Sequence, residues 1–244
     1  MTARGLFVTG TDTGVGKTRV AVALIHALRA RGLRVAAMKP VSAGHASQGD
    51  SDPLRAEARV ESYAPGGLNE DVAALLQAAN VAADLRDVNP YAFAEPIAPH
   101  IAAQQAGVRI DLAVIVAAYS RLAAKADVVV VEGAGGWRVP LNEREDMADL
   151  AQALGLPIVL VVGLRLGCLN HALLTVESIA TRRLPWAGWV GNTIDPVMAL
   201  RAANLEALRA RLPGPCLGVQ DFISDPVLAA DSPQWLILPE ALVS

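Results

Sequence analysis

The sequence contains little cysteine and few aromatic residues. Its two cysteines, Cys168 and Cys216, have no spacing typical of metal ligands, so we expect no zinc site, and a reduced protein explains them better than a disulfide. Aromatic residues make up 4% of the chain and hydrophobic residues 53%. The core must therefore consist of alanine, valine and leucine, which is typical of helices packed on a buried parallel sheet.

The sequence also lacks blocks of like charge and long apolar runs. The formal net charge is −3 without clusters of lysine or arginine, so there is no electrostatic footprint for nucleic acid. The N-terminus does not read as a signal peptide, and the longest apolar runs, such as residues 156–163, have the length of a strand. We expect a cytoplasmic protein without nucleic-acid or membrane partners.

The 244 residues suit one large α/β domain better than two small ones. We expect a single domain over residues 1–244, with a variable polar loop region at 45–68 and a divergent tail at 221–244.

A glycine-rich turn from Gly10 to Thr18 follows an apolar run and opens a helical one. Gly14 and Gly16 allow backbone N–H groups to point inward, where they and the positive end of the helix can bind phosphates. Lys17 would reach the terminal phosphates and Thr18 would bind Mg²⁺. Five residues rather than the usual four separate Gly10 from Gly16. A turn without a ligand is the alternative, and we favour a nucleoside triphosphate site.

Two further strands end in residues that suit the same site. The strand at 33–38 ends at Lys39, and ligands bind at the carboxyl edge of open α/β sheets, so we place Lys39 in the active site rather than on the surface. The strand at 127–131 ends at Glu132, and a buried glutamate needs a partner. We expect Glu132 to hold Mg²⁺, the alternative being a carboxylate that caps the next turn.

The remaining pattern alternates strands and helices. Asn69 and the acidic residues after it cap an apolar helical run through Ala79, and residues 45–67 form a loop with room for one short helix. Residues 89–96 are expected to be a surface connection. The expected strands are 5–9, 33–38, 127–131, 157–162, 186–190 and 216–219, and the later helices are 111–124, 146–154, a long helix ending near 183, and one ending at 212.

Five motifs in order resemble the dethiobiotin synthetases. They are Gly-Thr-Asp-Thr-Gly-Val-Gly-Lys-Thr at 10–18, Lys-Pro-Val at 39–41, Asn-Pro-Tyr-Ala-Phe-Ala-Glu-Pro at 89–96, Glu-Gly-Ala-Gly-Gly-Trp at 132–137 and Gly-Cys-Leu-Asn-His at 167–171. The resemblance covers residues 5–220. It implies a single-domain phosphate-loop NTPase-like α/β fold, with a mostly parallel sheet of seven or a similar number of strands and helices on both faces.

The resemblance also implies an activity. Members of this family close a ureido ring on 7,8-diaminononanoate with CO₂, using ATP and Mg²⁺, in biotin biosynthesis. They are homodimers with the active site at the interface. Charge on the transferring phosphoryl group would be neutralised by Lys17, Lys39 and Mg²⁺.

Residue roles follow from the same resemblance. Lys39 and Lys17 are catalytic, Asn192 reads adenine, and Asn170 meets the substrate carboxylate across the dimer interface. The metal residues are Thr18, Asp71 and Glu132. The ATP-binding residues are Gly14, Val15, Gly16, Lys17, Thr18, Arg19, Asp71, Glu132, Gly133, Ala134, Gly135, Asn192, Thr193 and Asp221. The substrate-binding residues are Lys39, Ser42, Ala43 and Asn170.

Some positions depart from the family pattern. Ala43 stands where relatives often have serine or threonine, with Ser42 one residue earlier, and Asp221 replaces a proline of the adenine pocket. Nucleotide selectivity therefore stays open, and residues 45–69 are longer than the family pattern.

Two other classes of protein are alternatives. A partition-type ATPase acting as a dimerisation switch should show a basic patch or a C-terminal amphipathic helix, and neither is visible. An amidoligase of the cobyrinate type would need a glutaminase domain, for which 244 residues leave no room unless another chain supplies it.

Overall fold

The computed structural model describes residues 4–44, 68–223 and 234–242. The polar loop expected at 45–67, with any short helix in it, lies outside the described residues, as does much of the tail after 223.

A six-stranded parallel sheet forms the centre of the molecule, in the order β2-β5-β1-β6-β7-β8. Its strands are β1 (Arg4–Gly10), β2 (Val35–Met38), β5 (Val128–Glu132), β6 (Ile158–Leu164), β7 (Trp186–Thr193) and β8 (Cys216–Gln220). The expected mostly parallel sheet is confirmed, with six strands among the described residues where the resemblance implied seven or a similar number.

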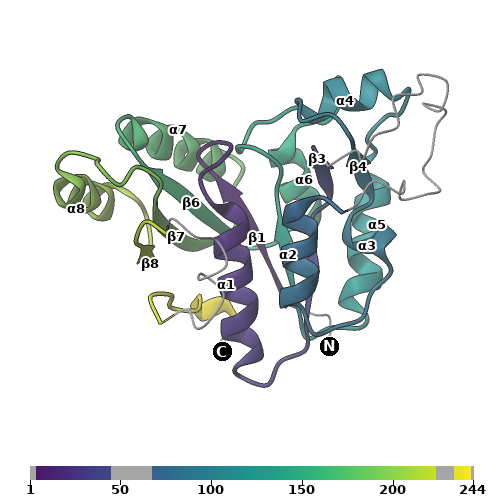
Figure 1. Cartoon of the computed structure of the whole chain (residues 1–244), viewed down its shortest axis with the longest axis horizontal. Coiled ribbons are helices and arrows are strands. Elements are labelled where there is room, and N and C mark those ends of the chain that lie inside the picture. Colours follow the sequence, from purple (N-terminus) through teal and green to yellow (C-terminus); the bar gives the residue numbers. More distant parts are fainter. Residues whose placement is uncertain (1–3, 45–67, 224–233, 243–244) are drawn as a thin grey trace.

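Helices cover both faces of this sheet (Figure 1). α1 (Lys17–Arg29) and α2 (Glu70–Ala78) lie side by side on one face, in a core with Leu6 and Val8 of β1. Phe7, between these two, points to the opposite face because side chains alternate along a strand. The helices on that face are α5 (Leu112–Ala123), α6 (Met147–Leu154), α7 (Cys168–Thr181) and α8 (Arg201–Arg211).

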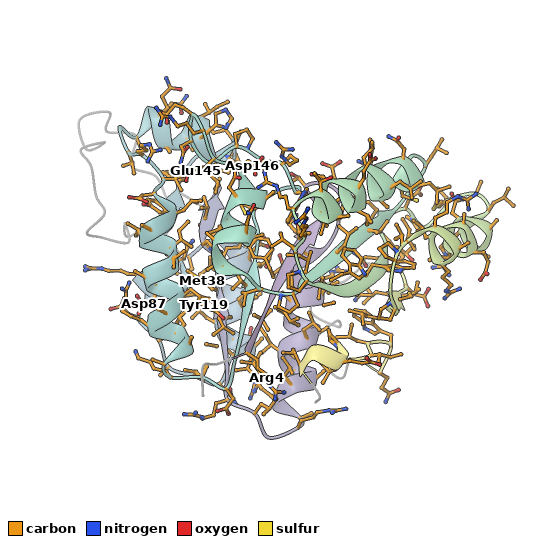
Figure 2. All side chains as sticks on the ribbon, turned by 180° about the vertical axis from the view of Figure 1, so that it is seen from behind. Arg4, Met38, Asp87, Tyr119, Glu145 and Asp146 are labelled. Atoms are coloured by element: carbon orange, nitrogen blue, oxygen red, sulfur yellow. The ribbon has the colours of Figure 1, made fainter. Side chains whose placement is uncertain are left out.

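The valine-rich composition of the strands explains their central position. β5 is four valines and Glu132, every one of them buried, which fits a strand with helices on both sides. Figure 2 shows the molecule from behind and labels two residues of the core on the same face as Phe7. Met38, at the end of β2, is buried in this core, and Tyr119 of α5 is partly buried and packs against it.

Polar caps begin several helices where the sequence predicted them. The side chain of Asn69 accepts hydrogen bonds from Asp71 N and Val72 N at the start of α2. Asp111 accepts from Ala113 N at the start of α5. Asp146 forms a capping box with Asp149 at the start of α6 (Figure 2).

A second sheet of two short parallel strands was not predicted. β3 (Val41–Ala43) pairs with β4 (Tyr91–Phe93), and the short helices α3 (Leu85–Val88) and α4 (Pro99–Gln105) flank β4. The sequence led us to expect a surface connection at 89–96 and no strand at 41–43. Strands of three residues carry too short a pattern to be recognised, since alternation needs about four residues or more.

The end of the described chain returns to the main sheet. Leu236 forms an antiparallel bridge with Gly218 of β8, and Ile237 N donates to Leu217 O at 2.7 Å. A 3₁₀ turn, Glu240–Leu242, follows, and Leu242 is buried in the core beside α1. In the described part of the chain, no helix is both long and apolar enough to cross a membrane.

Candidate active site

A cavity of about 690 Å³ opens at the carboxyl ends of the central strands. The phosphate loop after β1 lies on one side of it, and the small sheet β3–β4 with the segment before α4 lies on the other. Its lining residues are Thr13, Gly14, Gly16, Lys17, Thr18, Arg19, Lys39, Val41, Ser42, Ala43, Asn69, Asp71, Pro96, Ile97, Ala98, Pro99, Glu132, Ala134, Gly135 and Val139. The cavity thus brings together residues from well-separated stretches of sequence.

The phosphate loop has the backbone conformation expected from its glycines. Gly14 has φ 72° and Gly16 has φ 86°, both in the left-handed region that glycine tolerates best. A Cβ on Gly16 would lie 2.1 Å from Nδ2 of Asn192, whereas a Cβ on Gly14 would meet nothing within 4 Å. Asn192, at the end of β7, donates from this Nδ2 to Val15 O at 2.8 Å, which ties β7 to the loop. Only a glycine at position 16 allows this contact.

Lys17 is held inside the loop. Its Nζ donates to Asp12 O at 3.0 Å, and the Asp12 carboxylate accepts from Thr13 N and pairs with Arg165, which follows β6. Burial, together with the positive charge of Lys39, lowers the pKa of Lys17 to about 8. A cationic group at this position faces the space where the loop can bind phosphates.

Lys39 lies between two carboxylates on the cavity floor. Its Nζ is 2.5 Å from Oε1 of Glu132 and 2.8 Å from Oδ2 of Asp71, and the Thr18 hydroxyl lies 2.9 Å from the same Glu132 oxygen and 2.7 Å from Oδ1 of Asp71. The ammonium is almost completely buried. Three residues from distant parts of the sequence, Lys39, Asp71 and Glu132, therefore form one charged cluster.

The pKa values in this cluster follow from burial and charge. Burial favours neutral Lys39, but Glu132 and Asp71 outweigh burial and raise the pKa of Lys39 above its ordinary value. Burial raises the pKa of Glu132, which has no exposed surface, and Lys39 offsets part of this rise. For the more exposed Asp71, burial is outweighed by Lys39 and the Thr18 hydroxyl, so its pKa is lowered.

Comparison with known proteins identifies the family. A family model described as an AAA domain matches residues 4–225. A protein of Nitrosospira multiformis named ATP-dependent dethiobiotin synthetase BioD is 51% identical, over 90% of this chain and 88% of that protein. A protein of the same name from Aromatoleum aromaticum is also 51% identical, over 94% of this chain and 96% of that protein. The chain belongs to the dethiobiotin synthetase family.

The solved structures that resemble this chain share only its fold. The septum site-determining protein MinD of Pyrococcus horikoshii has a TM-score of 0.53 at 17% identity, over 94% of this chain and 86% of that chain. Chloroplast FtsY of Physcomitrella patens has a TM-score of 0.52 at 15% identity, over 99% of this chain and 63% of that chain. These likenesses confirm the phosphate-loop α/β fold and carry no information on activity.

The residues present suit the magnesium ion that the dethiobiotin synthetase family implies. Oε2 of Glu132 is buried and has no hydrogen-bond partner in the described part of the chain, although it lies beside the Thr18 hydroxyl and the Asp71 carboxylate. Carboxylate and hydroxyl oxygens are the ligands that Mg²⁺ prefers. A cluster of three or more His, Cys, Asp or Glu is absent among the described residues, so a hydroxyl would have to complete the set.

Some of the other expected nucleotide residues line the cavity, and the remaining ones do not: Val15, Gly133, Asn192, Thr193 and Asp221. Arg19, Ala134 and Gly135 line the cavity, and Arg19 also donates to Ile223 O at 3.3 Å. Gly133 is not a lining residue, and its N–H donates a hydrogen bond to Val8 O at 2.9 Å. Thr193 and Asp221 are not among the cavity residues, and both accept a hydrogen bond from Nη1 of Arg201. Arg201 carries no motif, so the sequence offered no signal for it.

On the substrate side, Ser42 and Ala43 line the cavity. Asn170 does not: it is exposed in the first turn of α7 and is not a lining residue. Two parts of the cavity wall were not predicted from the sequence. They are the segment Pro96, Ile97, Ala98 and Pro99, and Asn69, which donates from Nδ2 to Gly44 O. The proline cluster at 96–99 was the available signal, and it was interpreted as a surface connection.

Proposed function

We propose that this chain is an ATP-dependent dethiobiotin synthetase that closes a ureido ring on 7,8-diaminononanoate with CO₂, giving dethiobiotin, ADP and phosphate in biotin biosynthesis. The observation that carries the proposal is the 51% identity to proteins of that name over almost the whole chain. The charged cavity supports it, because a phosphate loop and a second buried lysine face the same space.

The reaction divides into three steps. One amine of the substrate takes up CO₂ and loses a proton, which gives a carbamate. A carbamate oxygen then attacks the γ-phosphorus of ATP, and the bond to the ADP oxygen breaks. The second amine attacks the carbonyl carbon of the resulting mixed anhydride and loses a proton, the bond to the phosphate oxygen breaks so that phosphate leaves, and the ring closes.

The residues of the cavity suit the second of these steps. Negative charge is spread over the transferring phosphoryl group, so fixed positive charges and N–H groups stabilise the transition state more than they would in water. Lys17, Lys39 and the backbone of the phosphate loop supply them. Mg²⁺, held by Thr18, Asp71 and Glu132, would supply further neutralising charge when bound. Catalysis then consists mainly of positioning and electrostatic stabilisation.

Asn192 supports the assignment of the adenine subsite beyond the phosphate loop. Its Oδ1 is buried and accepts no hydrogen bond from the described residues, while its Nδ2 is bound to Val15 O. An exocyclic amine of the base could supply the missing donor. Thr193 and Asp221, joined through Arg201, would form the nearby wall.

We also propose a homodimer in which α7 faces the partner's active site. Asn170 lies outside its own cavity, and three leucines near it are exposed: Leu166 just before α7, and Leu173 and Leu174 within it. Apolar groups at such a surface favour association. Asn170 would bind the substrate carboxylate of the neighbouring subunit. We place the protein in the cytoplasm, with small molecules as its ligands.

The test is product formation. The protein, incubated with diaminononanoate, bicarbonate, Mg²⁺ and ATP, should give dethiobiotin detectable by mass, and the Lys39→Ala variant in parallel should form it far more slowly. Absence of dethiobiotin from the parent protein under these conditions would refute the proposal.

A further inference from the structure

The chain on both sides of Lys39 is bound by a segment that has no role in the proposed function. Lys39 lies where the chain leaves β2 of the large sheet and enters β3 of the small one. Residues 88–91 supply its backbone partners at this junction. Lys39 N donates to Val88 O at 2.8 Å, and Tyr91 N donates to Pro40 O at 3.2 Å. The carbonyl of Lys39 accepts from the side chain of Asn89 at 2.6 Å.

The side chain of Asn89 is the centre of this arrangement. It is 2% exposed, and its Nδ2 donates to Tyr91 O at 3.1 Å as well as to Lys39 O. Its Oδ1 accepts from the Ser42 hydroxyl at 2.9 Å. Two carbonyl oxygens therefore face the nitrogen and a hydroxyl faces the oxygen, which sets the orientation of the amide.

An amide is needed for these contacts. A carboxylate of the same shape has no hydrogen to donate when ionised, and it would place an oxygen against the carbonyl oxygens of Lys39 and Tyr91. A buried carbonyl without a donor is unfavourable, so the backbone at Lys39 would shift to find another partner.

A shift at this point moves the ammonium in the active site. The Lys39 side chain begins at the Cα next to the bound carbonyl and reaches Glu132 and Asp71, with which it forms two short ion pairs. Because both ends of the side chain are held, its position relative to the phosphate loop depends on the backbone junction.

We propose that Asn89 is a positioning residue for the reaction, acting through Lys39. This inference rests on the proposed function. Asn89 fixes the backbone carbonyl of Lys39, and thereby the place of the ammonium that neutralises the transferring phosphoryl group.

The alternative is that Asn89 only joins the two sheets. In that case its loss would lower thermal stability and leave turnover by the folded enzyme unchanged. Positioning of a catalytic group predicts something different, namely a loss of kcat without a loss of nucleotide affinity, because the phosphate loop binds nucleotide from β1 and α1 rather than from β2.

The experiment compares Asn89→Asp with Asn80→Asp. Asn80 is a suitable control because its side chain also binds the backbone near β2, at the other end, accepting from Val35 N at 2.7 Å and donating to Leu33 O at 3.1 Å. We measure kcat for dethiobiotin formation, the Kd for ADP, and the Tm of each variant, with rates taken well below the lowest Tm.

For Asn89→Asp we expect kcat to fall on the order of 10²-fold, a loss that a displacement of about 1 Å at a reacting group can cause, while the Kd for ADP changes less than about twofold. The Asn80→Asp variant should keep the kcat of the parent. If Asn89→Asp does not fold, Asn89→Ser, whose hydroxyl can replace one of the two donated bonds, is measured with the same expectation.

A kcat within about threefold of the parent would overturn the inference, as would a parallel loss of ADP affinity and turnover. These outcomes are separate from failure of the proposed function. If the parent forms no dethiobiotin, the function is wrong whatever Asn89 does, whereas an active parent with an equally active Asn89→Asp variant refutes only the inference.

Discussion

The close contact between Gly16 and Asn192 makes a quantitative prediction about the phosphate loop. In Gly16→Ala, a residue with a Cβ would adopt φ 86°, which costs about 1–2 kcal/mol. The new Cβ would also lie 2.1 Å from Nδ2 of Asn192, so this amide must move and its bond to Val15 O is lost. A buried hydrogen bond of this kind contributes about 1 kcal/mol, and more if its partner is left unpaired. The free energy of unfolding should therefore fall by about 2–4 kcal/mol.

Gly14→Ala is the matched control. Its φ of 72° imposes a similar backbone strain, but nothing lies within 4 Å of the added Cβ. It should therefore cost only about 1–2 kcal/mol. The two variants differ in the displaced Asn192 amide and in little else.

Urea unfolding of both variants measures the difference in free energy directly. In thermal unfolding of a chain of this size we expect a Tm lower by roughly 5–15 °C for Gly16→Ala, and a smaller change for Gly14→Ala. Equal losses of stability would show that the contact with Asn192 contributes nothing, and would refute the steric explanation for glycine at position 16.

Three further predictions concern the proposed site. Lys39→Ala should retain ATP binding and lose at least about 10²-fold in kcat, because the phosphate loop binds nucleotide without β2; loss of ATP affinity with high residual turnover would reverse the roles of Lys39 and Lys17. Asp71→Asn should raise the Mg²⁺ concentration needed for half-maximal activity at least about tenfold. The double change of Asp50 and Asp52 to asparagine should not, although these aspartates are nearer to Lys39 in the sequence and are the alternative metal residues; the opposite pattern in a Mg²⁺ titration would refute the assignment. Inactive Lys39→Ala and inactive Asn170→Ala should restore activity when mixed, because each hybrid dimer would contain one intact site; no recovery despite proven subunit exchange would place Asn170 outside the partner's site.

The main sheet could be predicted because its strands carry strong local patterns. The four valines of β5 and the apolar run of β6 can hardly form anything but buried strands, and the helices between them begin at capping residues such as Asp111 and Asp146. The ends of the helices and strands were predicted less accurately. α1 begins at Lys17, directly after the left-handed Gly16, although its apolar repeat starts only at Val20.

The small sheet could not be predicted, because its stability depends on contacts distant in sequence. β3 and β4 have three residues each, and their pairing joins Val41 to Tyr91, which are 50 positions apart. Neither strand carries a periodicity of its own. The contacts of Asn89 could not be predicted either, since two of its three described partners are backbone carbonyls, which every residue has.

Lys39 and Glu132 were expected at the site from their residue types and positions, and Asp71 was expected there from the family resemblance. Lys39, Asp71 and Glu132 each lie at the end of a strand or the start of a helix, where the sequence placed them, and the structure brings all three together. The sequence could not indicate that Lys39 pairs with both carboxylates. That pairing depends on the relative positions of three separate elements, β2, α2 and β5.

Release of ADP in the presence and absence of each substrate tests the central claim most directly. If the carbamate of the diamine is the group that attacks the γ-phosphate, ADP should form only when diaminononanoate and CO₂ are both present, with one ADP for each dethiobiotin, because water is a poor substitute in a closed site. Rapid ATP hydrolysis without the diamine would contradict the account and would indicate an ATPase instead.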